Sequence, residues 1–384
     1  NQVMDDLGNF PYLATYGTNS SYNYLINGSK PVIVKAPGLV APDFTWETVT
    51  QMDFGFDASF LNNRLTGTFD WYRRNTKDML VAGATLPATL GASVPKSNSA
   101  DMKTIGWELS LGWNDRLENG FSYWVKGVLS DYQATITKYA GNDAGFYSQS
   151  DGDGKYYVGQ KIGEIWGYHS NGLFQSDDEA ATIDQSELYA GKWGAGDVKY
   201  EDLGNDGKIT KGEETIYNPG DKSIIGNKTP RYQFGITVGF DYKNFDFEMF
   251  WQGTGKRDYM LSGAQFWGFT SQWDVPYTPA LDYWTETNTD AYFPRPGWQN
   301  GGNRVTSDRY LQSAAYGRLK NLTVGYTIPK NLTTKWGISR LRLYVTGENL
   351  LTITPLNDAF DPETLGGMTY PINRKVAIGL NLTL

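Results

Sequence analysis

The sequence predicts an all-β protein whose antiparallel strands form part of a transmembrane β-barrel. Apolar and polar residues alternate with a period of two in about nine segments. Short and long links between these segments also alternate along the chain. The mean hydropathy is −0.49, and no run approaches the roughly 18 apolar residues that a membrane-spanning helix needs. A barrel strand hides its lipid-facing residues in the alternation, so low hydropathy is compatible with this prediction.

Residues 1–46 are rich in Gly, Asn, Ser and Pro and lack sustained alternation, so we expect an extracellular loop that leads into the first strand. The chain starts at Asn1, without an initiator Met, a basic segment or an apolar leader. We therefore expect it to be a processed or partial piece of something longer. Residues 47–384 carry the alternating segments and form the barrel portion.

The first hairpin covers residues 52–71. Its apolar positions are Met52, Phe54, Phe56, Ala58 and Phe60 before the turn and Leu65, Gly67, Phe69 and Trp71 after it. Polar residues occupy the positions between them, so one face is apolar and the other polar. Asn tolerates left-handed backbone angles, and Asn62-Asn63 therefore predicts a tight turn.

Seven further segments repeat the pattern, at residues 105–113, 123–129, 234–242, 245–251, 322–328, 341–345 and 376–384. Their length suits barrel strands, which need about 9–11 residues to span a bilayer. Nine strands leave the last one without a partner, so we expect the rest of the barrel upstream or on another chain.

The links between the strands indicate which ends lie together. Short links fall at 62–64, 115–120, 243–244 and 329–338, and long links at 81–101, 138–230, 257–311 and 352–371. Outer-membrane barrels have short periplasmic turns and long extracellular loops. A soluble sandwich has no reason to place all its long loops at one end.

Composition excludes several classes of function. The absence of cysteine excludes disulfides, thiolate catalysis and Cys-based metal sites. The formal net charge of −8, without a basic stripe, argues against nucleic-acid binding. His169 is the only histidine, which we interpret as leaving no material for a His-based metal site or a nucleophilic triad. Adjacent acids such as Asp177-Asp178 suit a solvated loop better than glycosidase chemistry, so we expect no enzyme.

Residues 202–213 have the spacing of a calcium loop, with Asp at positions 1 and 5, Gly at 6 and Glu at 12. The candidate ligands are Asp202, Asp206, Glu213 and the backbone oxygen of Lys208. Gly204 occupies position 3 and removes one ligand unless Asn205 substitutes for it. The segment is therefore either a calcium site or an acidic surface turn.

The link between residues 256 and 303 is dense in aromatic residues. Such residues suit stacking on sugars or docking of a protein partner, but they also suit a loop that packs on itself as an ordered lid wall. The candidates for contact with a substrate or partner are Phe266, Trp267, Trp273, Tyr283, Trp284, Tyr292 and Trp298.

Several segments are similar to SusC/RagA-type TonB-dependent outer-membrane transporters. They are NNRLTGTFDWYRRNTKDML at 62–80, GWELSLGWND at 106–115, GQKIGEIWGY at 159–168, IIGNKTPRYQFG at 224–235, YGRLKNLTVGYTIP at 316–329, LRLYVTGENLLTIT at 341–354 and FDPE at 360–363. The similarity runs in order from about Phe44 to the C-terminus.

The resemblance implies a barrel of about 22 strands with a plugged lumen, of which this chain is the C-terminal part. It also implies a location in the cell outer membrane and import of oligosaccharides, or of peptides in some members. The implied partners are a SusD-like surface lipoprotein, the TonB complex acting through a plug outside this chain, and outer-membrane lipid. Apart from the possible calcium, no cofactor is expected.

Polar residues on the lumen side of the strands would line the wall or hold the plug by charge-assisted hydrogen bonds, unless they are merely solvated. They are Asp53, Asp57, Asp70, Arg74, Glu108, Asp241, Glu248, Arg342 and Glu348. The alternative is a soluble multi-sandwich glycan-binding protein without a transport role. Burial of Phe54 against protein would favour that alternative.

Overall fold

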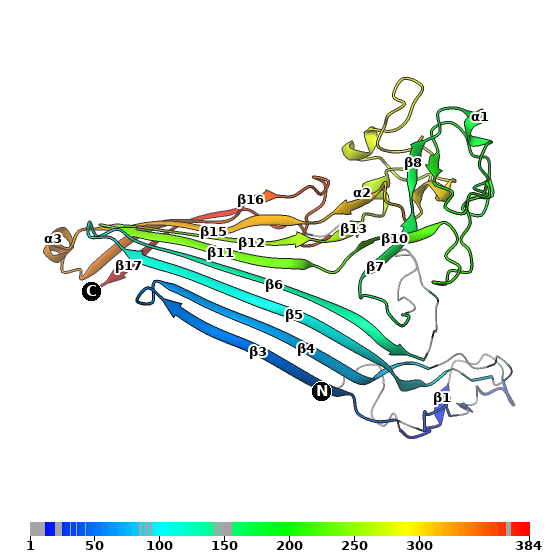
Figure 1. The fold of residues 1–384 in the computed structure, drawn as a ribbon, viewed down its shortest axis with the longest axis horizontal. Helices are drawn as coiled ribbons and strands as arrows, with labels where there is room; N and C mark the ends of the chain where they lie inside the picture. Colours follow the sequence, from blue (N-terminus) through cyan, green and yellow to red (C-terminus); the bar gives the residue numbers. More distant parts are fainter. Residues whose placement is uncertain are drawn as a thin grey trace.

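One curved antiparallel sheet dominates the computed structural model, and an irregular loop region stands at one of its ends (Figure 1). The structure describes residues 12–19, 25–30, 32–35, 37–42, 44–83, 87, 89, 91–92, 94–140, 142, 145, 156–365 and 370–384.

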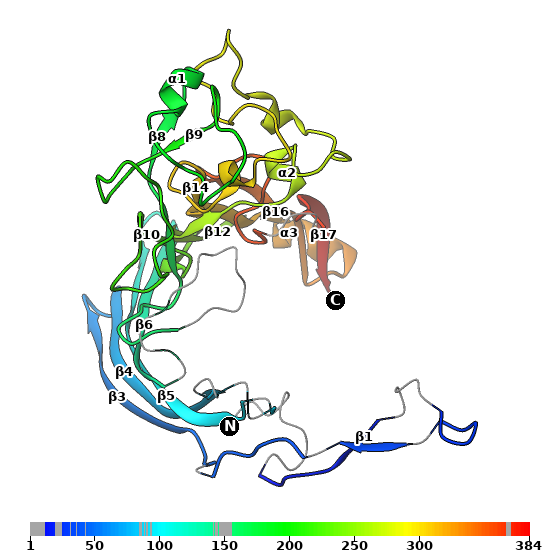
Figure 2. The same cartoon turned by 90° about the vertical axis from the view of Figure 1, so that its right-hand side faces the viewer.

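The sheet has nine strands, each hydrogen-bonded to the next large strand along the chain. They are β3 (Thr48–Phe60), β4 (Leu65–Ala82), β5 (Lys96–Arg116), β6 (Ser122–Tyr139), β11 (Arg231–Tyr242), β12 (Phe245–Lys256), β15 (Tyr316–Thr327), β16 (Arg340–Ile353) and β17 (Lys375–Thr383). This up-and-down order confirms the nine predicted strands. Within the described residues β3 and β17 do not pair with each other, and the sheet forms an open arc (Figure 2).

Strands β4, β5 and β6 extend further toward the loop end than the alternation predicts. The link expected at 81–101 shrinks because β4 continues to Ala82 and β5 begins at Lys96. The register shifts between Thr76 and Met79 on β4, and again near Met102 on β5. Each bulge interrupts the period of two without ending the ladder, and the sequence pattern therefore hides the continuation.

Residues 1–46 also contain more structure than expected. A short strand β1 (Gly17–Asn19) pairs with β2 (Ile33–Lys35) in a region predicted to be loop alone.

The links sort by length as expected, with the turns at one end of the sheet and the long loops at the other (Figure 1). Leu61, Asn62 and Asn63 have φ values of 55°, 56° and 65°, which confirms the predicted tight turn. The turn-end link between β15 and β16 contains α3 (Lys330–Thr333) and η5 (Thr334–Trp336).

The outer face of the sheet carries the apolar residues of the alternation, and they remain exposed. Phe54 is 63% exposed and Ile378 is 82% exposed. In register, Phe54 lies opposite Trp71, which lies opposite Trp107, so the apolar positions form continuous rows. Such a large exposed apolar surface indicates contact with lipid. The sandwich alternative is wrong, because a second sheet would bury this face.

Aromatic rings gather on the outer face near the turn end. Phe121 stacks on Phe240 at a centroid distance of 5.5 Å, and Phe245 contacts Tyr326 at 4.7 Å. Aromatic girdles of this kind mark the membrane–water interface of barrels.

Phe56 offers a direct test of lipid contact, because it pairs with Phe69, and Phe69 pairs with Leu109. Leu109 is the middle residue of the outward-facing apolar row of β5, which runs from Ile105 to Trp113. We expect Phe56→Arg to destabilise the membrane-inserted protein by about 2–4 kcal/mol, the cost of a cation on the lipid face near the midplane. The measurement is the folded fraction of the complete transporter in lipid vesicles, read from heat-modifiable gel mobility. Asp57→Arg, on the opposite face, is the control, and equal loss in both variants would contradict lipid contact.

The long loops fold together into one domain with its own apolar core. Its short elements are β7 (Glu164–Tyr168), β8 (Ser170–Leu173), α1 (Asp177–Ala180), β9 (Val198–Tyr200), β10 (Lys222–Asn227), β13 (Asp258–Met260), α2 (Ala264–Trp267), η3 (Thr278–Leu281), η4 (Gly301–Arg304) and β14 (Leu311–Ser313). Three of these loops contribute to the core: residues 138–230 supply Tyr200 and Ile209, residues 257–311 supply Phe266, and residues 352–371, here called the third long loop, supply Phe360. Among the described helices, none is long and apolar enough to cross a membrane.

Candidate functional site

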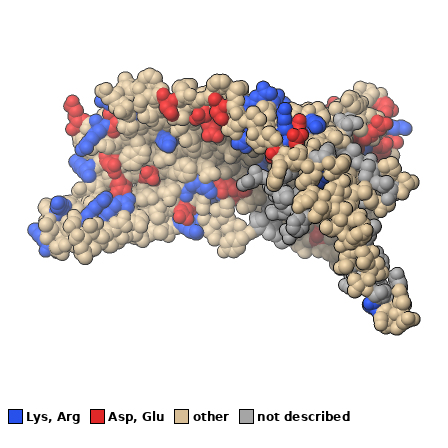
Figure 3. Space-filling view, turned by 90° about the horizontal axis from the view of Figure 1, so that it is seen from below, with Lys and Arg blue, Asp and Glu red and all other residues tan. Residues whose placement is uncertain are grey.

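The predicted lumen residues all lie on one face of the sheet. Directly opposed residues of an antiparallel pair share a face, and Gly55 opposes Asp70, which opposes Glu108. The same register places Asp241 opposite Asp246. By the same pairing across the sheet, six further predicted residues lie on this face: Asp53, Asp57, Arg74, Glu248, Arg342 and Glu348. Acidic and basic side chains lie in and around the hollow of the sheet (Figure 3). Their functional role remains a prediction.

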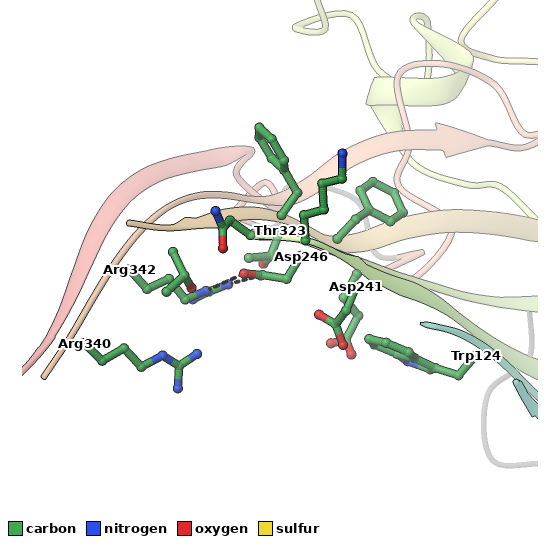
Figure 4. A pocket seen from close by; sticks show the side chains of 12 residues that line it. Trp124, Asp241, Asp246, Thr323, Arg340 and Arg342 are labelled. Atoms are coloured by element: carbon green, nitrogen blue, oxygen red, sulfur yellow. Dashed lines mark hydrogen bonds and ion pairs between the residues drawn. The ribbon is translucent and has the colours of Figure 1, made fainter. Parts of the chain in front are cut away.

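A cavity of about 570 Å³ opens on this face near the turn end, between β6, β11, β12, β15 and β16 (Figure 4). Arg342 and Asp246 make a bidentate ion pair there, with 2.8 Å between Nε and Oδ1. The Arg342 guanidinium also lies 4.8 Å from the ring centroid of Tyr344. These contacts hold the guanidinium in one place, so the pair is a rigid part of the wall.

Four other charged residues of this cavity make no ion pair within the described part of the chain. They are Asp241, Lys243, Glu248 and Arg340, which line the cavity beside the Arg342–Asp246 pair. Arg340 points into the open space in Figure 4. Their donors and acceptors remain free for whatever occupies the lumen.

Buried charge networks tie the loop domain together. The side chain of Asp197, 1% exposed, accepts hydrogen bonds from Arg295 Nε at 3.0 Å, Asn303 Nδ2 at 2.8 Å and the Gly194 backbone amide at 2.9 Å. Buried carboxylates are stable in proteins when they are paired in this way. Tyr200, whose pKa is raised by burial, stays a neutral donor and gives its O–H to the Gly302 carbonyl at 2.7 Å.

A second network explains the FDPE segment. Arg318 of β15, with its side chain 2% exposed, pairs with Asp361, and its Nη1 lies 3.0 Å from Glu363 Oε2. Lys320 also reaches Glu363, at 2.9 Å. Phe360 enters the apolar core. The FDPE segment therefore anchors the third long loop to the inner wall. Its amino-acid sequence alone did not predict this role.

The single histidine joins three segments of the loop domain. His169 Nδ1 lies 2.7 Å from Asp308 Oδ2, and Nε2 lies 2.7 Å from Ser223 Oγ. Our interpretation that one histidine leaves no material for a triad is wrong, because a Ser–His–Asp arrangement needs only one. The Asp308 Oδ1 atom accepts the Ser170 backbone amide at 3.0 Å. These contacts connect the β7–β8 junction, β10 and the segment before β14.

The aromatic candidates divide into core and surface residues. Phe266 and Trp267 are 0% and 8% exposed and pack against Phe293 and Tyr310, so most of each ring is buried in the core. Three others are partly buried against the same core, namely Tyr283, Trp284 and Tyr292. Trp273 and Trp298 are exposed, at 83% and 46%. Aromatic density in the sequence marks both kinds of residue, and only packing separates them.

The calcium-like loop directs its carboxylates toward its own backbone. Asp202 accepts the amides of Asp206 and Gly207, and Asp206 accepts the Lys208 amide. The buried Asp221 accepts the amides of Leu203, Gly204 and Thr210. In the described part of the chain no three acidic or histidine side chains are grouped to hold a metal ion, and Glu213 does not join the others. The residues thus do not fit a calcium cage, and calcium binding stays an untested prediction that titration after EDTA treatment would check.

Comparison with known proteins identifies the family that shares this architecture. The family model for TonB dependent receptor-like β-barrels matches residues 6–350. TonB-dependent receptor P3 of Formosa agariphila is 29% identical over 409 residues, which covers 97% of this chain and 38% of the relative. SusC of Bacteroides thetaiotaomicron, also a TonB-dependent receptor, is 26% identical over 380 residues, covering 97% of this chain and 35% of SusC.

Among solved structures, the RagAB peptide transporter superimposes with a TM-score of 0.73 at 22% identity, covering 97% of this chain and 38% of that one. This likeness supports the fold. The chain spans less than two fifths of the length of the relatives it matches. Members of this family are outer-membrane proteins. With the family model covering most of its 384 residues, the chain belongs to the TonB-dependent receptor-like β-barrel family.

Proposed function

We propose that this chain is part of a TonB-dependent importer of oligosaccharides or peptides in the cell outer membrane. The observation that carries the proposal is the division of the sheet into an exposed apolar outer face and a charged, hollowed inner face. A barrel wall that separates lipid from a polar passage needs this division. The family membership supports the same conclusion.

The inner wall is proposed to hold the plug that closes the lumen, a domain outside this chain. Asp241, Glu248 and Arg340 have no ion-pair partner in the described chain, and opposite charges on a plug would pair with them. The remaining lumen residues of the register line the passage around this contact. TonB then acts on the plug rather than on the wall.

The loop domain is proposed to meet the SusD-like lipoprotein and the substrate at the cell surface. Its apolar core and ion-pair networks hold the loops in a fixed arrangement, and the side chains of Trp273 and Trp298 are exposed on its surface. Exposed tryptophans are frequent energetic centres of protein interfaces and also stack on sugars.

The function is tested in a host strain that carries the complete transporter and its lipoprotein. We expect growth on an oligosaccharide or peptide pool to require the transporter and TonB. Replacing Trp273 and Trp298 together by alanine should weaken capture of the lipoprotein by about tenfold or more, since interface tryptophans are often worth about 2 kcal/mol.

Trp336 provides a matched control, because it is 62% exposed but lies in η5 at the turn end. Trp336→Ala should leave capture unchanged. Growth that is independent of TonB would refute the import function. Equal losses from both sets of substitutions would refute only the docking surface.

A further inference from the structure

The inner wall changes character along β4, β5 and β6. Near the turns most of its residues are small, polar or charged, as where Asp70 opposes Glu108, and Trp124 of β6 is an exception. Higher up, Thr76 opposes Met102, and Met102 opposes Ile136. The register keeps these residues on the same face as the charged ones. A continuous apolar patch on a wall that is mostly polar favours an apolar occupant.

A cavity of about 560 Å³ is formed over this patch. Four tyrosines contribute to its lining: Tyr72 from β4, Tyr132 and Tyr139 from β6, and Tyr156 from the following loop. Most other lining residues are aliphatic or Met, and Arg74 is the one charged residue among them. The volume lies in the range of about 300–1,000 Å³ typical of small-ligand sites.

The cavity lies at the loop end of the passage, where a substrate would enter. Arg74 and Thr104 line it, while their chain neighbours Arg73 and Lys103 face outward. These two cations mark where the apolar band of the outer face ends, above Trp71 and Trp107. The cavity is therefore level with the extracellular edge of the membrane.

Arg74 is available to bind an anion. Its Nε donates to Gln51 Oε1 at 3.0 Å, and the terminal nitrogens of the guanidinium have no partner in the described chain. A guanidinium held on one side pairs well with a carboxylate on the other. Arg74 lies beside an apolar, tyrosine-rich lining, so the site matches an apolar group attached to a carboxylate.

We propose that this cavity is a subsite for a short peptide, with the apolar C-terminal side chain between the tyrosines and the terminal carboxylate on Arg74. The inference rests on the proposed import function and names its substrate class. An oligosaccharide presents hydroxyl groups throughout, and an aliphatic lining leaves many of them without hydrogen bonds. A peptide with a Phe or Leu end buries apolar surface there instead.

The experiment uses the complete transporter with its lipoprotein in detergent and isothermal titration with three probes. They are the tripeptide Gly-Gly-Phe, the same peptide with a C-terminal amide, and maltohexaose. Arg74→Met should weaken binding of the free acid by about tenfold and leave the amide within about twofold, since it removes one charge-assisted pair. Ala134→Trp, which fills the cavity, should weaken both peptides by about tenfold or more.

Thr104→Tyr fills the same cavity from β5 and serves if Ala134→Trp does not fold. Thr68→Val, lower on the same face of β4, is the matched control and should change neither peptide. Peptide binding unaffected by the filling variants would overturn the inference, as would maltohexaose binding that they abolish. A lower melting temperature with unchanged binding would show that protein covers the patch, and would overturn it too. A wild-type importer that takes up only oligosaccharide defeats this inference alone, whereas TonB-independent growth defeats the import function.

Discussion

Arg318→Met is expected to release the third long loop from the inner wall. Its side chain is 2% exposed, and its guanidinium pairs with Asp361 and Glu363. Methionine keeps much of the length and apolar bulk but leaves both carboxylates without their main cation. Removing one partner of a buried ion pair costs about 3–5 kcal/mol, because the remaining charge stays poorly solvated. Lys320 still reaches Glu363, and Asp361 therefore loses the most.

Hydrogen exchange in the complete transporter measures this release. Faster exchange is expected for residues 356–365, with little change in β15 or β16. Lys192→Met serves as the control. It breaks an exposed ion pair, in which the Lys192 side chain is 79% exposed and the Asp177 side chain 56%. Exposed pairs contribute little to stability, so the control should exchange like wild type. Unchanged protection in Arg318→Met would show that Phe360 packing and the Lys320–Glu363 pair anchor the loop without Arg318.

Asp197→Ala is expected to unfold much of the loop domain. Asp197 accepts hydrogen bonds from Arg295, Asn303 and the Gly194 amide, and so ties together segments about 100 residues apart. Alanine leaves the buried Asn303 and Gly194 donors without their acceptor and removes the anionic partner of Arg295. Loss of a buried charged partner, with its hydrogen bonds, costs about 3–5 kcal/mol. That is a large share of the roughly 5–15 kcal/mol of a typical domain.

Limited proteolysis in lipid vesicles separates this effect from damage to the barrel. We expect cleavage between residues 170 and 310, while the sheet keeps its heat-modifiable gel mobility. Asp178→Ala, at an exposed position of α1, should keep wild-type resistance. If Asp197→Ala resists proteolysis as well as the control does, the apolar core rather than the Asp197 network stabilises this domain.

The strands were predictable because the residues of each strand alternate between those that suit lipid and those that suit the polar lumen. In the first hairpin, Met52 to Phe60 face lipid at every second position, and no contact from elsewhere in the chain is needed to read that pattern. The turn at Asn62-Asn63 was equally local, since it depends on which side chains tolerate positive φ. Prediction failed where bulges shifted the register, as at Met79 and Met102.

The loop domain was not predictable in the same way. Phe266 and Trp273 lie seven residues apart in one aromatic segment, yet one is fully buried and the other 83% exposed. Asp202 and Asp206 have the spacing of calcium ligands but accept amides of their own loop. His169 finds Asp308 far along the chain. Each outcome depends on long-range packing.

The sequence by itself determined the all-β class, the sorting of short and long links, and the division of the sheet into an apolar and a polar face. Those features follow from the period-two geometry of strands and from local turn chemistry. Tertiary structure alone decided which aromatics form a core, how Arg318 and Asp197 join distant loops, and where the inner wall turns apolar above Arg74. The reason is that burial and pairing between distant segments depend on the three-dimensional path of the chain, which no local pattern encodes.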